Sequence, residues 1–133
     1  MITINDRQII AFIDLGSEVV TARYSDACNL SLNYETSIIK LSGFGGGSCQ
    51  TIGKCTYPFR IDDVEIVADI YIVPDYSQND PIIIGRNVLD DHNIKVTIQG
   101  KMLTIENVNV KQVCQIEHNK NYKERNVVNE MVQ

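Results

Sequence analysis

A single carboxylate stands at the end of an apolar run near the start of the chain. Asp14 follows the segment "IIAFI" and precedes Leu15, Gly16 and Ser17. A run this apolar predicts a strand that enters a core. Burying a carboxylate costs several kcal/mol unless it is paired, hydrogen-bonded or protonated. Asp14 is therefore either a structural cap at the strand end or a group placed there for acid–base chemistry.

Two further segments have unusual composition. The cluster "SGFGGGS" holds Gly43, Phe44, Gly45, Gly46 and Gly47, and it predicts the tip of a hairpin or a plain flexible loop. It is not a phosphate-binding loop, because the following "SCQTIGKC" lacks the first glycine and the final Ser or Thr of that motif. The second segment, "PIIIGRNVLDDH", predicts a fully buried strand that Gly85 stops, followed by a short helix.

The elements that must position these residues are mostly strands. "MITI" and "QIIAFID" predict a hairpin with its turn at Asn5 and Asp6, and "VVTARY" and "VEIVADIYIVPD" alternate as strands do. Two more strands flank the glycine cluster, and "IKVTIQGKMLTIE" predicts a hairpin about Gly100. "SDACNLSL" has room for one helical turn, with Ser25 or Asp26 as its cap.

Composition narrows the function classes. The 133 residues suit one core, the formal net charge is −5, and the basic residues form no patch, so we expect no nucleic-acid partner. No apolar run approaches the ~20 residues that span a bilayer, and "MITINDRQ" lacks a signal layout, so we expect no membrane partner and a cytoplasmic protein. The four cysteines and two histidines have no metal-ligand spacing, which predicts reduced thiols and neither metal nor cofactor.

The order of these features resembles one known family. An apolar strand ending in Asp-x-Gly-Ser, a glycine-rich hairpin, and "IIIGRNVL" about seventy residues later resemble the retropepsins, the single-domain aspartic proteases of retroviruses and long-terminal-repeat retrotransposons. The likeness is greatest to Ty3/gypsy-type elements. It implies an all-β, closed-barrel-like protomer with one short α-helix and a glycine-rich flap over residues 1–108, followed by a polar tail or linker over residues 109–133.

The resemblance also implies a mechanism and a partner. In aspartic proteases two carboxylates share one proton, so that one deprotonates water while the other protonates the carbonyl of the peptide. This chain has one Asp-x-Gly, so its second carboxylate must be Asp14 of another copy, in a two-fold homodimer. Gly43 to Gly47 would form the flap, with Phe44 covering a peptide that binds as an added strand.

Residues around Asp14 would support its loop. Gly16 lets the chain turn so that backbone N–H groups face the carboxylate, and Glu18 would pair with Arg86 of "GRN", as acidic residues at this position do in the family. A weak surface pair is the alternative for these two side chains. Asn87 would begin or cap the helix. Leu15 departs from the family, whose Thr or Ser at this position bonds to the opposite subunit.

We therefore expect a homodimeric aspartic endopeptidase that cuts its own Gag-Pol-like polyprotein, in the cytoplasm or inside virus-like particles. Two alternatives remain. One is a catalytically inactive or domesticated retropepsin-fold module that dimerises or binds peptides, which Leu15 favours. The other is a dimeric ubiquitin-pathway domain of the same fold.

Overall fold

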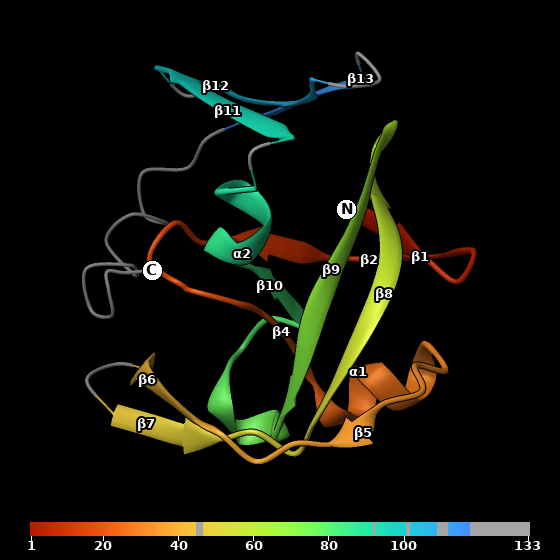
Figure 1. Cartoon of the computed structure of the whole chain (residues 1–133), viewed down its shortest axis with the longest axis vertical. Coiled ribbons are helices and arrows are strands. Elements are labelled where there is room, and N and C mark those ends of the chain that lie inside the picture. Colours follow the sequence, from red (N-terminus) through yellow and green to blue (C-terminus); the bar gives the residue numbers. More distant parts are fainter. Residues whose placement is uncertain (45–46, 92, 101, 109–111, 118–133) are drawn as a thin grey trace.

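The computed structural model describes residues 1–44, 47–91, 93–100, 102–108 and 112–117 (Figure 1). The strands within these residues are β1 Ile2–Ile4, β2 Arg7–Ile9, β3 Ala11–Ile13, β4 Val20–Arg23, β5 Glu35–Thr36, β6 Lys40–Phe44, β7 Gly47–Gln50, β8 Gly53–Ile61, β9 Val64–Val73, β10 Ile82–Ile84, β11 Ile94–Gln99, β12 Met102–Asn107 and β13 Gln112–Glu117. The helices are α1 Tyr24–Asn29, the 3₁₀ turn η1 Asp75–Ser77, and α2 Arg86–Leu89.

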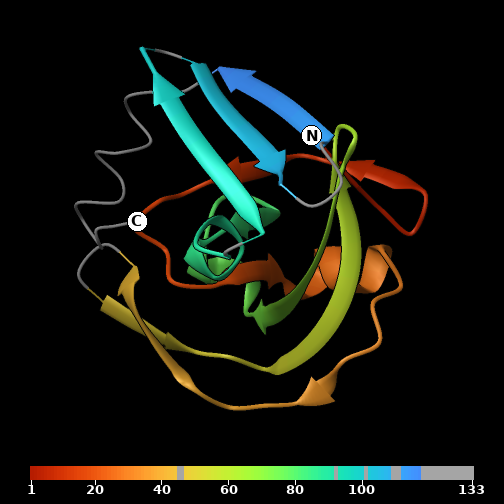
Figure 2. The same ribbon diagram turned by 45° about the horizontal axis from the view of Figure 1, so that its top comes forward.

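The strands form one large sheet and two small ones. The large sheet has the order β2-β1-β8-β9-β4-β10-β3, with β5 paired to β8. β11, β12 and β13 form a second sheet, and β6 and β7 form a third. Figure 2 shows the strands running round the molecule with α2 near its centre. The predicted all-β, barrel-like architecture is confirmed.

Local sequence explains the individual strands. Asn5 and Asp6 both adopt positive φ, 50° and 62°, and join β1 to β2 in the tight turn that their residue types predict. The residues of β9 alternate, so that Val64, Ile66 and Ile70 are buried while their neighbours face outward. All three isoleucines of β10 are buried, so both faces of this strand are covered, and neighbouring strands pair with its backbone on both edges.

The core is almost entirely aliphatic. Its members come from both ends of the chain, since Leu103 and Ile105 of β12 pack with Ile2 and Ile4 of β1 in one cluster. Each fully buried Val, Leu or Ile contributes about 1.5–3 kcal/mol to stability. The second sheet therefore closes the large sheet on the side that β12 covers.

The strand β10 lies between two strands that precede it by sixty residues or more. It is parallel to β3, with Ile84 opposite Ile13, and antiparallel to β4, with Ile83 opposite Thr21. The chain that leaves β3 must therefore pass around the end of β10 to reach β4. Residues 14–19 make this passage, and we call them the Asp14 loop.

The helices differ from the prediction in number and capping. The resemblance implied one short α-helix, whereas the described residues contain two, which lie in the two segments where the sequence had room for helical turns. α1 begins after Arg23, not at a Ser25 or Asp26 cap, and the backbone N–H of Ser25 donates instead to Asp75 Oδ1 at 2.9 Å. α2 begins at Arg86 and has Gly85 as its N-cap, so the prediction that Asn87 begins or caps this helix is wrong.

The segment predicted as a polar tail contains one strand. Residues 112–117 pair antiparallel with β12, so the ordered sheet extends beyond residue 108. Residues 118–133 lie outside the described residues, and their role as a tail or linker stays a prediction. No helix among the described residues is long and apolar enough to cross a membrane.

Candidate active site

Asp14 lies where β3 ends, and its surroundings bury it. Asp14 is 3% exposed in the single chain, and its backbone N–H donates to the carbonyl of Ile84 at 3.0 Å. This bond continues the parallel ladder between β3 and β10 by one step. The position of the carboxylate is thus fixed by the register of Ile13 against Ile84.

The turn that follows supplies one donor to this carboxylate and one to the backbone carbonyl of Asp14. The backbone N–H of Gly16 donates to Asp14 Oδ1 at 3.0 Å, and the N–H of Ser17 donates to the carbonyl of Asp14 at 3.1 Å. The predicted contact between a backbone N–H and the carboxylate is therefore present. A donor within hydrogen-bond distance offsets part of the cost of burying a carboxylate.

The segment that follows β10 holds the Asp14 loop through the backbone. Arg86 N–H donates to the carbonyl of Ser17 at 2.7 Å, and Asn87 N–H donates to the carbonyl of Glu18 at 2.9 Å. Gly85 lies directly against the backbone of Val19, and a Cβ added at Gly85 would be 2.2 Å from the Val19 carbonyl oxygen. "GRN" thus contacts three consecutive residues of the loop.

The Asn87 side chain makes two hydrogen bonds near the site that the sequence did not predict. Its Oδ1 accepts from the backbone N–H of Val20 at 3.0 Å, and its Nδ2 donates to the carbonyl of Asp69 at 3.1 Å. These partners lie on β4 and β9, which begin their parallel pairing with Val20 opposite Ile70. The amide therefore bridges the two strands where their ladder starts. An Asn within the first turn of a helix is a signal for such a bond, but it does not identify the partner.

The predicted ion pair between Glu18 and Arg86 is wrong. Arg86 Nε pairs with Asp90 Oδ2 at 2.9 Å, and both side chains are more than half exposed. Asp90 follows Arg86 by four residues, so the end of α2 presents a partner that needs no tertiary alignment. A pair this exposed contributes about 0–1 kcal/mol. Arg86 supports the loop through its backbone N–H instead.

Leu15 and Ser17 complete the described loop. Leu15 is partly buried and packs against the hydrophobic core. The Ser17 hydroxyl donates to the carbonyl of Val19 at 2.8 Å, which tightens the chain just before β4. Leu15 therefore contributes apolar contact within this chain.

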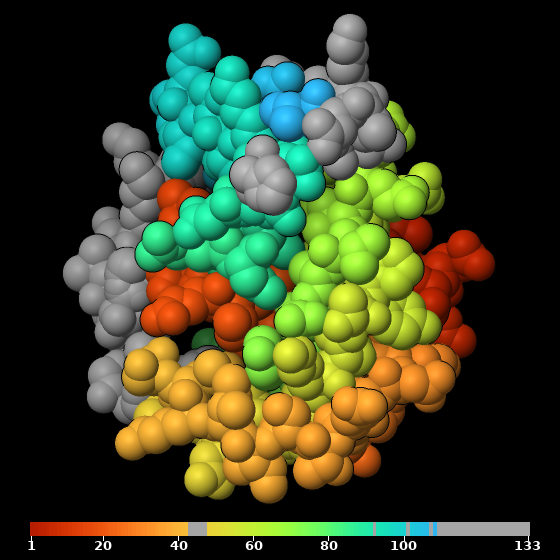
Figure 3. Space-filling view, in the orientation of Figure 1, coloured from red at the N-terminus to blue at the C-terminus, as the bar shows by residue number. Residues whose placement is uncertain are grey.

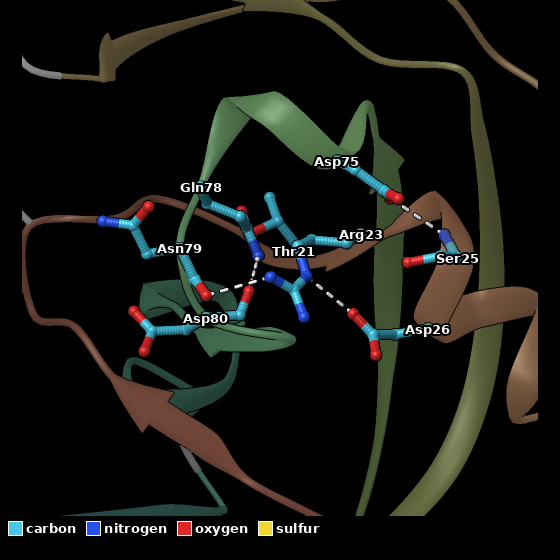
Figure 4. Close-up of polar contacts among 8 residues, drawn as sticks. All are labelled: Thr21, Arg23, Ser25, Asp26, Asp75, Gln78, Asn79 and Asp80. Atoms are coloured by element: carbon cyan, nitrogen blue, oxygen red, sulfur yellow. Dashed lines mark hydrogen bonds and ion pairs between the residues drawn. The ribbon is translucent and has the colours of Figure 1, made fainter.

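A second polar network fixes the segment between β9 and β10 (Figure 4). Arg23 Nε pairs with Asp26 Oδ2 at 2.7 Å, and Arg23 Nη1 donates to the carbonyl of Asn79 at 3.0 Å. The backbone N–H of Arg23 donates to the carbonyl of Pro81 at 3.0 Å. Arg23, at the end of β4, thus holds the chain that enters β10 through both its side chain and its backbone.

The same segment contributes a buried amide. Thr21 Oγ1 donates to Gln78 Oε1 at 2.7 Å, and Gln78 Nε2 donates to the carbonyl of Asp80 at 3.0 Å (Figure 4). Thr21 and Gln78 are both buried, so this pairing satisfies polar atoms that would otherwise destabilise the core.

The glycine-rich hairpin lies beside the Asp14 loop. β6 and β7 pair antiparallel, and their register shifts between Ser42 and Phe44. Figure 3 shows a hollow between this hairpin, in gold, and the segment after β3, in orange-red. Gly45 and Gly46 lie outside the described residues, as do the side-chain surroundings of Phe44. The predicted cover of the cleft by Phe44 therefore stays a prediction.

The thiols near this region are poor nucleophiles. Burial raises the pKa of Cys49, which a hydrogen bond with Ser77 partly opposes, and burial raises the pKa of Cys55. Both thiols are therefore protonated at neutral pH, and the thiolate is the reactive form. Among the described residues, no group of three or more His, Cys, Asp or Glu is placed to hold a metal ion.

Comparisons with known proteins support the fold. No family model matches the chain, and no curated protein matches it. Among solved structures, the retroviral protease-like domain of Ddi1 from Leishmania major superposes with a TM-score of 0.64 at 23% sequence identity. The match covers 90% of this chain and 93% of that chain. The chain therefore has a retropepsin-like fold, as its motifs predicted.

Proposed function

We propose that this chain is one protomer of a homodimeric aspartic endopeptidase. The observation that carries the proposal is the placement of Asp14, a buried carboxylate at a strand end that accepts a backbone N–H and whose loop is held by "GRN". An aspartate that only caps a strand end does not need support from a segment seventy residues away. A catalytic carboxylate needs such support, because it must keep its position against a second carboxylate.

The mechanism follows from two copies of this residue. A two-fold axis beside the Asp14 loop brings the two carboxylates together, and like charges this close cannot both ionise, so the pair holds one proton. The ionised carboxylate takes a proton from water, whose oxygen attacks the carbonyl carbon of the peptide. The protonated carboxyl donates its proton to the carbonyl oxygen, which gives a tetrahedral diol. The carboxyl that took the proton from water then passes it to the peptide nitrogen, and the C–N bond breaks as the amine leaves. The other carboxylate takes a proton back from the diol, so the products are a carboxylic acid and an amine, and the pair again holds one proton.

The substrate is an extended polypeptide. The hollow beside the Asp14 loop is bordered by the β6–β7 hairpin, and a peptide lying along a two-stranded hairpin can pair with it through backbone hydrogen bonds (Figure 3). By its resemblance to retrotransposon proteases, we propose that the natural substrate is the polyprotein that contains this chain, cut in the cytoplasm or inside virus-like particles.

The test is cleavage of a peptide library by Asp14→Asn and wild type. The variant should lose cleavage while keeping its fold, because an amide cannot take the proton from water. Asp63→Asn, a change in an exposed turn, is the matched control and should cleave like wild type. Wild-type activity should fall at high pH, when the shared proton is lost. Cleavage by Asp14→Asn would exclude the assignment.

Leu15 supports a second candidate, a non-catalytic module of the same fold. Leucine has no hydroxyl to offer a partner loop, and Leu15 packs against the core of its own chain. Such a module would bind peptide or dimerise without cleavage. Peptide binding by wild type with no product at any pH would favour this candidate over the protease.

A further inference from the structure

The β6–β7 hairpin joins the large sheet through an irregular junction. In the hairpin, Lys40 pairs with Gln50, and on the other side of the junction Thr36 pairs with Gly53. Between these two pairs, residues 37–39 stand opposite residues 51 and 52. One side therefore has one residue more than the other, which is the arrangement of a β-bulge.

Thr51 lies inside this junction and bonds across it. Its Oγ1 accepts from the backbone N–H of Ile39 at 2.9 Å and donates to the carbonyl of Ser37. Its own backbone N–H donates to the carbonyl of Ile39 at 2.9 Å. Thr51 is 3% exposed, so these bonds form away from solvent.

The next residue connects the junction to the body. Ile52 accepts from the N–H of Ser37 at 3.2 Å, and its own N–H donates to the carbonyl of Ile72 in β9 at 2.7 Å. Ile38, the middle residue of the longer side, is 66% exposed. The extra residue therefore projects outward, while the shorter side stays attached to the large sheet.

The hydroxyl of Thr51 replaces the bonds that the bulge removes. A bulge leaves one backbone N–H and one carbonyl without ladder partners, and leaving either unpaired in a partly buried place is costly. One hydroxyl satisfies both, as acceptor for Ile39 and donor to Ser37. Valine, which has the same shape, can satisfy neither.

We propose that Thr51 is the positioning residue of this hairpin, and that its hydroxyl sets the attachment of β6 and β7 to the large sheet. Where the hairpin covers a bound peptide, Thr51 also sets how firmly the hairpin closes on it. The effect on closure rests on the proposed protease function. The role of Thr51 in attaching the hairpin is independent of that function.

The experiment is amide hydrogen exchange on wild type, Thr51→Val and Thr51→Ser, followed residue by residue. Thr51→Val should raise exchange of Ile39 and of the β6–β7 amides by between about fivefold and a hundredfold, the range expected from the loss of two net hydrogen bonds. Amides of β8 and β9 should keep their wild-type rates. Thr51→Ser keeps the hydroxyl and should restore wild-type rates in the hairpin.

Thr56→Val is the matched control. Thr56 lies on the exposed face of β8, where its hydroxyl donates to Asp69 Oδ1 at 2.6 Å, so the same chemical change removes a bond outside the junction. The hairpin amides of this control should exchange as in wild type. Equal acceleration in Thr51→Val and Thr56→Val would overturn the proposal, as would hairpin rates in Thr51→Val equal to those of wild type.

Wild type alone gives a further readout that does not depend on whether Thr51→Val folds. The amides of Ile39 and Thr51 should open together with the hairpin and separately from β9. Exchange of Ile39 only with the whole protein would overturn the proposal. If wild type cleaves no peptide while these exchange results hold, the protease function fails and the role of Thr51 stands.

Discussion

The Asn87 side chain accepts the backbone N–H of Val20 across 67 residues of sequence, at 3.0 Å. Val20 is the first residue of β4 and the first after the Asp14 loop. The same amide donates to the carbonyl of Asp69, so one side chain joins the end of this loop to the longest strand. The position of Asp14 thus depends on a polar contact made from α2.

Replacement of Asn87 by alanine should destabilise the protein. Both Val20 N–H and the Asp69 carbonyl lose their partner in the interior, and the expected loss is about 2 to 4 kcal/mol of unfolding free energy. Urea unfolding of wild type and variant measures it. Asn79→Ala, at an exposed position, is the control and should change stability by under about 0.5 kcal/mol. Equal stability of the two variants would mean that the Asn87 amide contributes no net bond.

Gly85 should tolerate no side chain. A Cβ would lie 2.2 Å from the carbonyl oxygen and 2.5 Å from the carbonyl carbon of Val19, and neither backbone atom can move without moving the Asp14 loop. We expect Gly85→Ala to cost about 3 kcal/mol or more and to reduce any cleavage further than its stability loss explains. Urea unfolding and peptide cleavage measure the two effects.

Gly100 provides the contrast for Gly85. Its φ is +61°, and a Cβ added there would meet nothing within 4 Å, so conformation alone requires this glycine. Asparagine tolerates the left-handed region, and Gly100→Asn should cost under about 1 kcal/mol. If Gly85→Ala proved as mild as Gly100→Asn, the close approach to Val19 would be without consequence.

Local patterns predicted the strands well, because their signals lie within a few residues. The turn at Asn5 and Asp6 follows from residue type alone. The burial of β9 follows from period-two alternation, and that of β10 from three consecutive isoleucines. The retropepsin-like fold followed from two such motifs and their order.

The side-chain contacts of the site were predicted less well, because their partners are set by tertiary geometry. Arg86 pairs with Asp90, four residues along the chain. The sequence motif alone does not indicate whether Asp90 or Glu18 is the partner of Arg86. Asn87 reaches Asp69, and Thr51 reaches Ser37 and Ile39, only once strands distant in sequence lie side by side. α1 was placed within a few residues, but the acceptor for the Ser25 N–H in its first turn is Asp75, fifty residues further on.

The stabilising contribution of Asp75 should be lost in acid. The backbone N–H of Ser25, and then its hydroxyl, hold the pKa of Asp75 below its ordinary value. A carboxylate whose pKa is depressed in the folded state adds stability above its unfolded-state pKa, and this stability is lost as the pH falls through the folded-state pKa. Wild type should thus unfold at higher temperature than Asp75→Asn near about pH 6, and the difference should vanish near about pH 2.

The control for Asp75 is Asp63→Asn, at an exposed turn between β8 and β9. The unfolding temperature of Asp63→Asn should stay close to that of wild type across the same pH range. A constant gap between wild type and Asp75→Asn down to the lowest pH would show that the charge of Asp75 has no part in holding the start of α1.

If the proposed dimer forms, we expect residue 15 to influence its strength. In Leu15→Thr each loop gains a hydroxyl that can bond to the partner loop, worth about 0.5–1.5 kcal/mol per bond, and loses apolar contact with its own core, which costs the protomer about 1–2 kcal/mol. We therefore expect a lower unfolding midpoint in a dilute, monomeric sample together with a tighter dimer.

Leu15→Val is the matched control, because valine has the shape of threonine without the hydroxyl. Sedimentation over a dilution series should give dimers in the order Thr, then wild type, then Val. Equal dimerisation of the Thr and Val variants would show that the partner loop offers no acceptor or donor to residue 15, and that the association of this protein relies on other contacts.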